Sequence, residues 1–474
     1  LGEIYTFRSF LAMQRGERER ASSWARQALA LLPATGHAWR GMSLMSLGVE
    51  ALQTGQLGEA RHILAEIKTL WHNSVEPYVI DGITLLSGMV CFEQGDLHQA
   101  SLHFQKLYDS SSLPQDNPFS LGGLLGLARI CYERNDLDQV ERMLQILSSQ
   151  EAQITVIPVD IYRAVLGVNW ANLQQARGET DLAMQSLTSF LPHLRILPNE
   201  LALYFYQDIL DWLVRLSLRM EDHSTAQYWL DDASFFQSTG AFPSPDVSLL
   251  SSSDSSAAIE PHSSQNVSLA THTPFNQFIF VEQKRLLFAR LQLARKEEDA
   301  ALITLAELLP AAQAAGRGRR AFQMKLLMAQ AYAARKQMVE ARRILLEALK
   351  QGYAEGYQRL FLDEGNDLFY LLRDVLPHVQ GQALRNYIKT LIQAFAQPPH
   401  TSLGGSAVET FEPLSMQEQR VLRLLAAGNS NREIARQLVV SVNTVRSQVQ
   451  SIYRKLQVNN RYAAREAAHS LHLL

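Results

Sequence analysis

Residues 95–104 read GDLHQASLHF, and residues 135–144 read NDLDQVERML. Each stretch begins with a turn residue, Gly95 or Asn135, which is followed after five positions by a small residue and after four more by a large apolar one. Gly and Asn tolerate the left-handed backbone that ends a helix, and residues at i and i+4 share one face of the following helix. Each stretch therefore predicts the joint of a helical hairpin.

The same pattern recurs along most of the chain, at spacings of 39, 40, 40, 43, 43, 75 and 40 residues. Its turn positions are Gly16, Gly55, Gly95, Asn135, Gly178, Glu221, Lys296 and Lys336, and the small residues are Ala21, Ala60, Ala100, Val140, Ala183, Ala226, Ala301 and Ala341. Prolines between the turns mark where one repeat would end and the next begin: Pro33, Pro77, Pro118, Pro158 and Pro198. These repeats predict an all-α fold in which residues 1–396 form a tetratricopeptide-like solenoid with a concave binding face.

Two segments of different composition interrupt this pattern. Residues 234–274 hold 12 Ser and four Pro, and they account for the 75-residue spacing. Such a composition predicts a flexible surface insertion. Residues 397–413 contain paired Pro and paired Gly among small polar residues, which predicts a linker to a C-terminal domain at residues 414–474.

The composition excludes several classes of protein. With 47% hydrophobic and 19% charged residues, the chain has enough apolar material to fold, and no apolar run approaches the length of a membrane span. Cys91 and Cys131 hold the same position in adjacent repeats, which indicates buried small hydrophobes rather than a disulfide or metal site. Leu1 stands where Met would be expected and no signal peptide follows, so we expect a fragment of a cytoplasmic protein without a membrane partner.

The charge of the chain is unevenly distributed. Residues 412–474 carry nine Lys or Arg and four Glu, which gives +5, whereas the whole chain has a net charge of −3. A polyanion such as nucleic acid is therefore an expected partner for this segment alone. No HExxH, GxSxG or Cys/His cluster occurs, so we predict neither catalysis nor a metal site.

The C-terminal segment predicts a helix-turn-helix. Residues 415–418 and 430–433 both have the S-x-x-E form of a capping box, and Ser441 is a third N-cap candidate. From Val442 onward, apolar residues at spacings of 3, 4, 3 and 4 form one stripe. The opposite face is polar, as base edges and phosphates require, and it carries Asn443, Thr444, Arg446, Ser447, Gln450 and Arg454.

Two stretches closely resemble known regulators. The motif from Leu414 through Ser430-Asn-Arg-Glu-Ile-Ala and Thr444-Val-Arg to Ile452-Tyr-Arg-Lys-Leu-x-Val resembles the LuxR-type DNA-binding domain. Residues 356–365, GYQRLFLDEG, resemble the end of the sensor domain in large MalT-like LuxR regulators. Gln417 and Gln448 depart from the family's usual Arg and His. These departures would affect the orientation of the domain on DNA, or its phosphate contacts, more than DNA binding itself.

The resemblance implies roles for named residues. Bases would be read by Arg446, Ser447 and Gln450, and the DNA backbone would be contacted by Asn431, Arg432, Asn443, Thr444, Arg454 and Lys455. A fourth helix from Arg461 to Leu471 would pair two modules through Tyr462, Ala463 and Ala467.

The resemblance also implies partners. Promoter DNA, RNA polymerase, a second copy on DNA, and an unknown inducer or regulatory protein on the solenoid are expected. Relatives carry an N-terminal nucleotide-binding domain, but no G-x-x-x-x-G-K-[S/T] motif occurs here. No cofactor is therefore expected in this chain, and ATP is expected only in a domain missing from it. The alternative is a helical-repeat scaffold whose helical tail binds protein rather than DNA.

Overall fold

The computed structural model describes residues 1–15, 17–70, 77–109, 118–150, 159–194, 199–231, 275–396, 416–426, 429–438, 440–455, 461 and 464. Helices are the only regular elements in these ranges, which confirms the all-α prediction. The predicted insertion, 234–274, and the predicted linker, 397–413, lie outside them. The chain divides into two compact units, of which the larger holds Leu1–Gln175 and Glu179–Ala394 and the smaller is dominated by Phe395–Leu474. None of the described helices is long and apolar enough to cross a bilayer.

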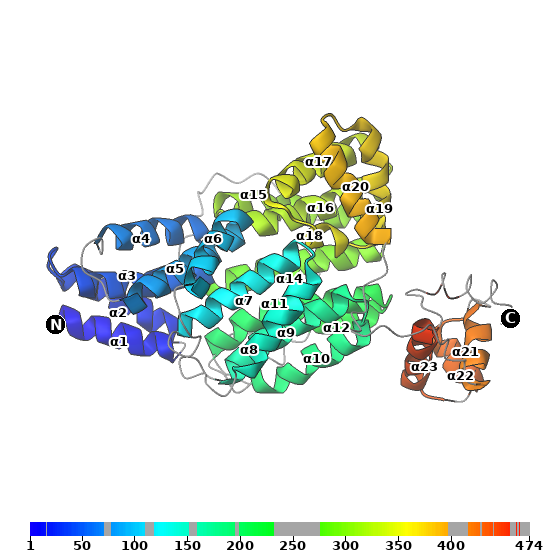
Figure 1. Cartoon of the computed structure of the whole chain (residues 1–474), viewed down its shortest axis with the longest axis horizontal. Coiled ribbons are helices and arrows are strands. Elements are labelled where there is room, and N and C mark those ends of the chain that lie inside the picture. Colours follow the sequence, from blue (N-terminus) through cyan, green and yellow to red (C-terminus); the bar gives the residue numbers. More distant parts are fainter. Residues whose placement is uncertain are drawn as a thin grey trace, which may run out of the picture. The chain divides into compact units, whose positions relative to one another are not determined.

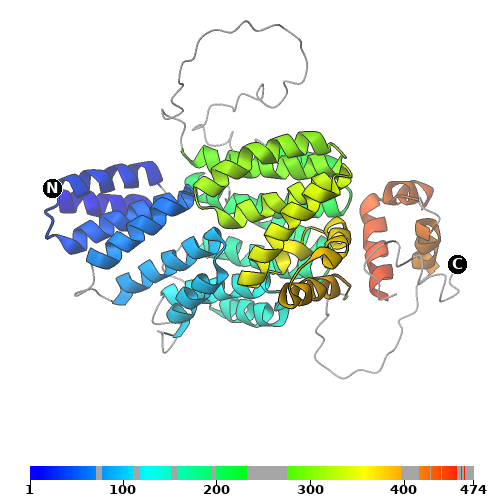
Figure 2. The ribbon, with the colours of Figure 1, turned by 90° about the horizontal axis from the view of Figure 1, so that it is seen from above.

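The larger unit is an array of helical hairpins (Figure 1). The first helices of eight described hairpins are α1 (Gly2–Gln14), α3 (His37–Gln53), α5 (Pro77–Gln94), α7 (Pro118–Glu133), α9 (Val159–Ala176), α11 (Asn199–Arg219), α14 (Phe275–Ala294) and α16 (Gly318–Ala334). Their second helices are α2 (Arg18–Leu31), α4 (Leu57–Leu70), α6 (Leu97–Asp109), α8 (Leu137–Ser149), α10 (Thr180–Leu194), α12 (His223–Asp231), α15 (Glu298–Ala314) and α17 (Met338–Glu355). Seen from above, neighbouring helices lie side by side (Figure 2).

The joints of the hairpins have the predicted left-handed backbone. Positive φ angles occur at all the predicted turn positions that the structure describes: Gly55, Gly95, Asn135, Gly178, Glu221, Lys296 and Lys336. At Gly95 the next amide, that of Asp96, donates to the Cys91 carbonyl at 2.9 Å, and the Gly95 amide donates to the Phe92 carbonyl at 3.0 Å. This pair of bonds is the Schellman motif, which satisfies the last carbonyls of a helix.

The second helix of a pair then begins at a capping Asp in several repeats. Asp96, Asp136 and Asp222 each accept a hydrogen bond from the backbone N–H three residues later, at 2.9, 3.2 and 3.0 Å. All the small residues after the turns are buried, from Ala21 to Ala341. Large apolar partners four positions later are buried with them: Leu64, Phe104, Leu144, Leu187, Leu230, Leu305 and Leu345. The local pattern thus sets both the turn and the contact face.

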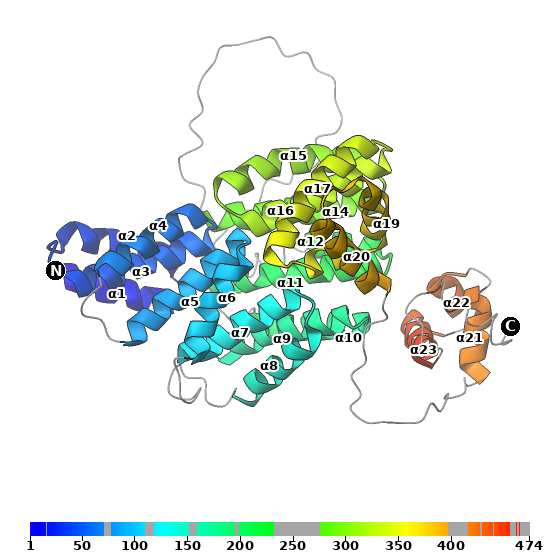
Figure 3. The same cartoon turned by 45° about the horizontal axis from the view of Figure 1, so that its top comes forward.

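Consecutive first helices form one layer of the array. Helix α3 packs on α5, α5 on α7, α11 on α14 and α14 on α16. The array also closes on itself, because α16 packs against α5 (Figure 3). There the Leu57 amide donates to the Ala315 carbonyl at 3.1 Å, and a Cβ on Gly318 would lie 2.0 Å from the Gln94 carbonyl oxygen. Only glycine permits this approach.

The segment at residues 356–365 lies within the closed array. It includes α18 (Arg359–Leu362) and precedes α19 (Asn366–Val375), a 3₁₀ turn (Leu376–His378) and α20 (Gln382–Ala396). Tyr357 and Phe361 are fully buried, each with its ring edge-to-face with Phe322 at 5.4 Å. The Gln358 amide donates to the Glu133 carbonyl at 2.7 Å. The segment therefore fastens the end of the array to its middle.

The two cysteines differ from expectation in one respect. Cys91 and Cys131 are both unbridged, as predicted, but they are half-buried rather than buried. Each lies four residues before a turn, near the end of the first helix of its hairpin. Burial still raises the pKa of both thiols, so these side chains behave as weakly polar packing groups.

Candidate nucleic-acid interface

The smaller unit contains three described helices around one apolar core. They are α21 (Met416–Ala426), α22 (Asn431–Leu438) and α23 (Val442–Lys455). Helix α23 packs on both of the others. The core holds Val421, Leu422, Leu425, Ile434, Ala435, Val445, Val449, Ile452 and Ala464. The predicted stripe of α23 is thus buried at Val445, Val449 and Ile452 and half-buried at Val442, and its other face is left for solvent.

A capping box begins α22, as predicted. The Ser430 amide and hydroxyl donate to the Glu433 carboxylate at 2.7 and 2.8 Å, and the Glu433 amide donates back to the Ser430 hydroxyl at 3.4 Å. The bond from the Ser430 backbone, followed by that from its hydroxyl, lowers the pKa of Glu433 below its ordinary value. The first helix's predicted cap, Ser415, lies outside the described residues.

Helix α23 has its own cap. The Ser441 hydroxyl accepts a hydrogen bond from the Thr444 amide at 3.0 Å, and the two hydroxyls lie 2.7 Å apart. Because the start of α23 is fixed in this way, the direction of its first turn is set. This matters for recognition, since a helix-turn-helix reads bases with the first turns of its second helix.

Most of the predicted DNA-contacting residues that the structure describes are exposed. Arg432, Asn443, Thr444, Ser447 and Gln450 are exposed, whereas Asn431 and Arg446 are half-buried. The Ser447 hydroxyl donates to the Asn443 carbonyl at 3.1 Å, so its oxygen lone pairs are left to accept from a base or from water. Together α22 and α23 present the donors and acceptors that a duplex requires.

Several predicted residues cannot be compared. The side chains of Arg454 and Lys455, at the end of α23, lie outside the described residues. So do Tyr462, Ala463 and Ala467, on which the pairing surface was predicted. Their roles stay predictions.

The structure adds two residues that hold the module together. The Arg461 guanidinium donates to the carbonyls of Leu425, at 2.9 Å, and Asn429, and so satisfies acceptors at and just beyond the end of α21. The Asn429 side-chain amide donates to the Leu424 carbonyl at 3.0 Å and accepts from Gln437 at 3.2 Å. Asn429 lies in the turn between α21 and α22, and Arg461 lies after α23. Helical periodicity therefore gave no signal for either residue.

No metal centre accompanies this surface in the part of the chain that the structure describes. Within those ranges no group of three or more His, Cys, Asp or Glu side chains could hold a metal ion. The surface offers hydrogen-bonding groups and positive charge. Arg420, Arg423, Arg432 and Arg436 are all exposed on α21 and α22.

An array of helical hairpins joined to a helix-turn-helix with a polar recognition helix defines a class of DNA-binding transcription regulators. The model of the MalT-like TPR region matches residues 2–188 and 147–378. The model of the bacterial regulatory proteins of the luxR family matches residues 412–468. The chain belongs to the proteins with a MalT-like TPR region, and its C-terminal module is of the LuxR type. Both families are regulatory rather than enzymatic.

One solved structure has a similar helical array. It is a Rap protein complexed with competence and sporulation factor, with 11% sequence identity and a TM-score of 0.45. The match covers 83% of this chain and 99% of that one.

Proposed function

We propose that this chain is a transcriptional activator that binds promoter DNA through α22 and α23 and whose TPR region responds to an inducer or a regulatory protein. The observation that carries the proposal is the capped α23, which buries its apolar stripe and exposes Asn443, Thr444, Ser447 and Gln450. RNA polymerase and a second copy of the module are the further partners we infer.

The alternative is a scaffold whose tail binds protein. A protein-binding helix would present an apolar or aromatic anchor at the centre of its exposed face. Here that face carries Arg446, Ser447 and Gln450, which suit base edges instead. We also propose that these 474 residues bind no ATP, which calorimetry with ATP tests directly.

The Arg446→Ala substitution tests the DNA-binding role. An Arg on a recognition helix can bond a guanine through two hydrogen bonds, so the loss should be about 1–3 kcal/mol on a selected site and small on random DNA. Fluorescence anisotropy with the full chain on both DNAs measures the two affinities.

Arg423→Ala is the matched control, since Arg423 is an exposed arginine on α21. It should weaken binding to both DNAs alike or to neither. An equal loss on both DNAs for Arg446→Ala would make Arg446 a phosphate contact, and no DNA binding by the unsubstituted chain would favour the scaffold.

A further inference from the structure

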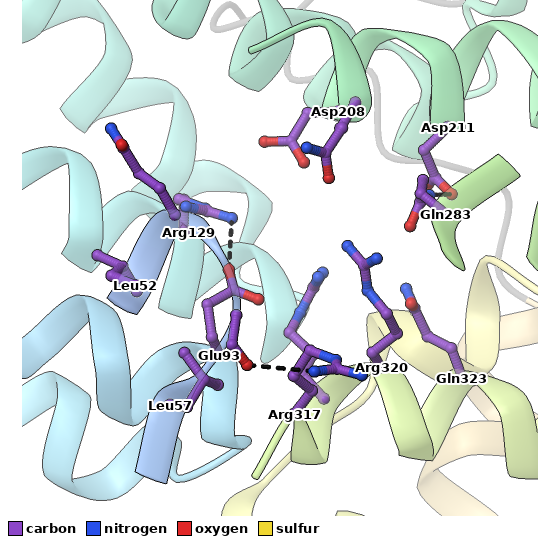
Figure 4. Close-up of a pocket in the computed structure, with 14 residues that line it drawn as sticks. Leu52, Leu57, Glu93, Arg129, Asp208, Asp211, Gln283, Arg317, Arg320 and Gln323 are labelled. Carbon is purple, nitrogen blue, oxygen red and sulfur yellow. Dashed lines mark hydrogen bonds and ion pairs between the residues drawn. The ribbon is translucent and has the colours of Figure 1, made fainter. Parts of the chain in front are cut away.

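The closed helical array contains a polar cavity of about 90 Å³. Its lining comes from the first helices α3, α5, α7, α11, α14 and α16, from Leu57 at the start of α4, and from the turns at Gly55 and Arg317 (Figure 4). One buried water needs roughly 10–15 Å³ on this measure, so the cavity has room for about six or more waters. A molecule of about that many non-hydrogen atoms would also fit.

Two of the arginines beside the cavity are committed to buried carboxylates. Arg317 forms a two-pronged ion pair with Glu282 and donates to the Gly55 carbonyl at 3.2 Å. Arg319 donates to Glu133 at 2.6 and 3.1 Å. The pair with Glu282 joins the start of α16 to α14, whereas the contacts with Gly55 and Glu133 join it to earlier repeats. Arg317 and Arg319 form one wall of the cavity.

Asp208 on α11 has no such partner. Among the described residues it makes no hydrogen bond or ion pair, and it faces the cavity beside Asp211 (Figure 4). Asp208 is an exposed residue, so its carboxylate is open to solvent and to a solute that enters the cavity. An additional positive charge close to Asp208 would therefore be stabilised.

Arg320 lies across the cavity from these carboxylates. Figure 4 shows its side chain extending from α16 toward the side that carries Asp208 and Asp211. Its nearest approach to Glu282 is 3.5 Å, and that carboxylate is already held by both prongs of Arg317. A guanidinium has five N–H donors, so Arg320 can bind a carboxylate in the cavity while it keeps this contact.

The remaining wall includes two apolar side chains. Leu52 and Leu57, from α3 and α4, line the cavity on the N-terminal side. The cavity thus combines a carboxylate without a partner, an arginine opposite it and a small apolar surface. These are the three groups that an α-amino acid with a small side chain would contact.

We propose that this cavity binds a free, small α-amino acid, with its ammonium group at Asp208 and Asp211 and its carboxylate at Arg320. The proposal rests on the proposed role of the TPR region as the responsive domain, and it names the chemical class of the ligand. An ion-paired ligand of this size would also bridge α11 and α16, which come from repeats far apart in the sequence.

Titration calorimetry of the full chain tests the proposal. The probes are glycine, L-alanine, L-serine and L-valine, with propionate and ethylamine as matched compounds that lack one charge, and glycerol as a neutral one. At least one amino acid should bind at least about tenfold more tightly than either singly charged compound. No binding by any amino acid, or tighter binding of glycerol or of a singly charged compound, would overturn the proposal.

Two variants locate the site. Asp208→Asn should lower the affinity for the amino acid at least tenfold without unfolding the chain, because Asp208 supports no other described group. Arg320→Gln should do the same, because Arg317 continues to hold Glu282. Asp367→Asn, an exposed carboxylate in the first turn of α19, is the control and should bind as the unsubstituted chain does. Undiminished binding by both cavity variants would contradict the assignment.

DNA binding is measured in parallel, so that two failures can be told apart. If the chain binds DNA but no amino acid, the proposed ligand class is wrong and the proposed DNA-binding function still holds. If an amino acid binds at Asp208 but leaves DNA affinity and transcription unchanged, the cavity assignment holds and the responsive role of the TPR region fails.

Discussion

Ser430 and Glu433 show how much one residue pair contributes to the DNA-binding module. Their reciprocal bonds satisfy donors at the start of α22 that would otherwise have no partner within the helix. Arg461 and Asn429 donate in turn to carbonyl acceptors at the end of α21. The recognition helix is therefore supported by hydrogen bonds at both neighbouring helix ends as well as by its apolar core.

The first prediction concerns the Glu433 carboxylate. Its folded-state pKa lies below its ordinary value of 4.5, so the stabilisation is present above that ordinary value and is lost as the pH falls through the folded-state pKa. Carbon NMR titration should give a midpoint below 4.5 in the full chain. Ser430→Ala should raise that midpoint, because the hydroxyl donor is lost.

Ser441→Ala, which removes the cap of α23 instead, should leave the Glu433 midpoint where it was. A midpoint at or above the ordinary value in the unsubstituted chain would show that the capping box does not form in solution.

At the scale of single residues, the sequence predicted contacts between residues that are close together in the chain. The caps at Ser430 and Ser441 could be predicted because cap and partner are three residues apart. The roles of Arg461 and Asp208 could not, since each depends on groups that only the folded chain brings near: carbonyls 32 and 36 residues away for Arg461, and helices of distant repeats for Asp208.

The hairpin joints decide the arrangement of the elements. Each joint requires one residue with positive φ, and the chain uses Gly at several joints but Glu221, Lys296 and Lys336 at others. A non-glycine side chain in this conformation costs about 1–2 kcal/mol. The later repeats therefore carry strain that glycine would remove.

Lys336→Gly should accordingly stabilise the chain. Glycine would relieve the backbone strain at Lys336, where φ is 62°. This relief exceeds the cost of the chain entropy that glycine loses on folding, so the free energy of unfolding should rise by about 0.5–1 kcal/mol. Urea unfolding measures it. Lys350→Gly is the matched control, because Lys350 is exposed within α17, and glycine there should cost about 1 kcal/mol. Equal effects of the two substitutions would exclude the left-handed turn as the cause.

The turns were predictable because the signal lies within ten residues. Closure of the array was not, since it depends on contacts such as the Leu57 amide with the Ala315 carbonyl, which no periodicity encodes. Gly318 was overlooked for the same reason: the repeat pattern does not require it, and only the approach of α16 to α5 does. Gly316 was overlooked because its left-handed turn, at φ 77°, lies between two hairpins and not at a hairpin joint.

At the scale of the whole repeat domain, Glu364 connects the end of the array to its middle. Its carboxylate accepts from Arg215 on α11 at 2.7 Å and from Arg290 on α14 at 2.6 and 2.7 Å. Tyr132 on α7 donates to the neighbouring Asp363 at 2.9 Å. Residues 363 and 364 thus join α7 to the neighbouring helices α11 and α14, in the segment that resembles the end of a sensor domain.

Glu364→Gln should destabilise the repeat domain by about 3–5 kcal/mol, because Arg290 would be left buried without a counter-charge and Arg215 would keep only Asp211, 3.6 Å away. Burial raises the pKa of Glu364, but the two guanidinium groups outweigh it and lower the pKa below 4.5. This stabilisation is therefore present above pH 4.5 and is lost as the pH falls further. Urea unfolding of both forms at neutral and acid pH measures the difference.

The difference in the free energy of unfolding between the unsubstituted chain and Glu364→Gln should shrink at acid pH. Arg343→Gln removes two exposed ion pairs on α17, with Glu340 and Glu347, and should change stability little. A cost for Glu364→Gln no larger than that of this control would mean that the buried pairs do not fasten the array.

The DNA-binding module presents few charges for a duplex. With a net charge of +5 over residues 412–474, one copy can neutralise only a few phosphates, so we expect weak binding by a single copy. Two linked copies on two half-sites make the second encounter intramolecular. Fusing the chain to a constitutive dimeriser should therefore raise affinity for a two-half-site promoter by at least about tenfold, and change affinity for one half-site little. Sedimentation of the unfused chain and gel-shift titrations of both forms measure this, and nanomolar binding by a demonstrated monomer would contradict it.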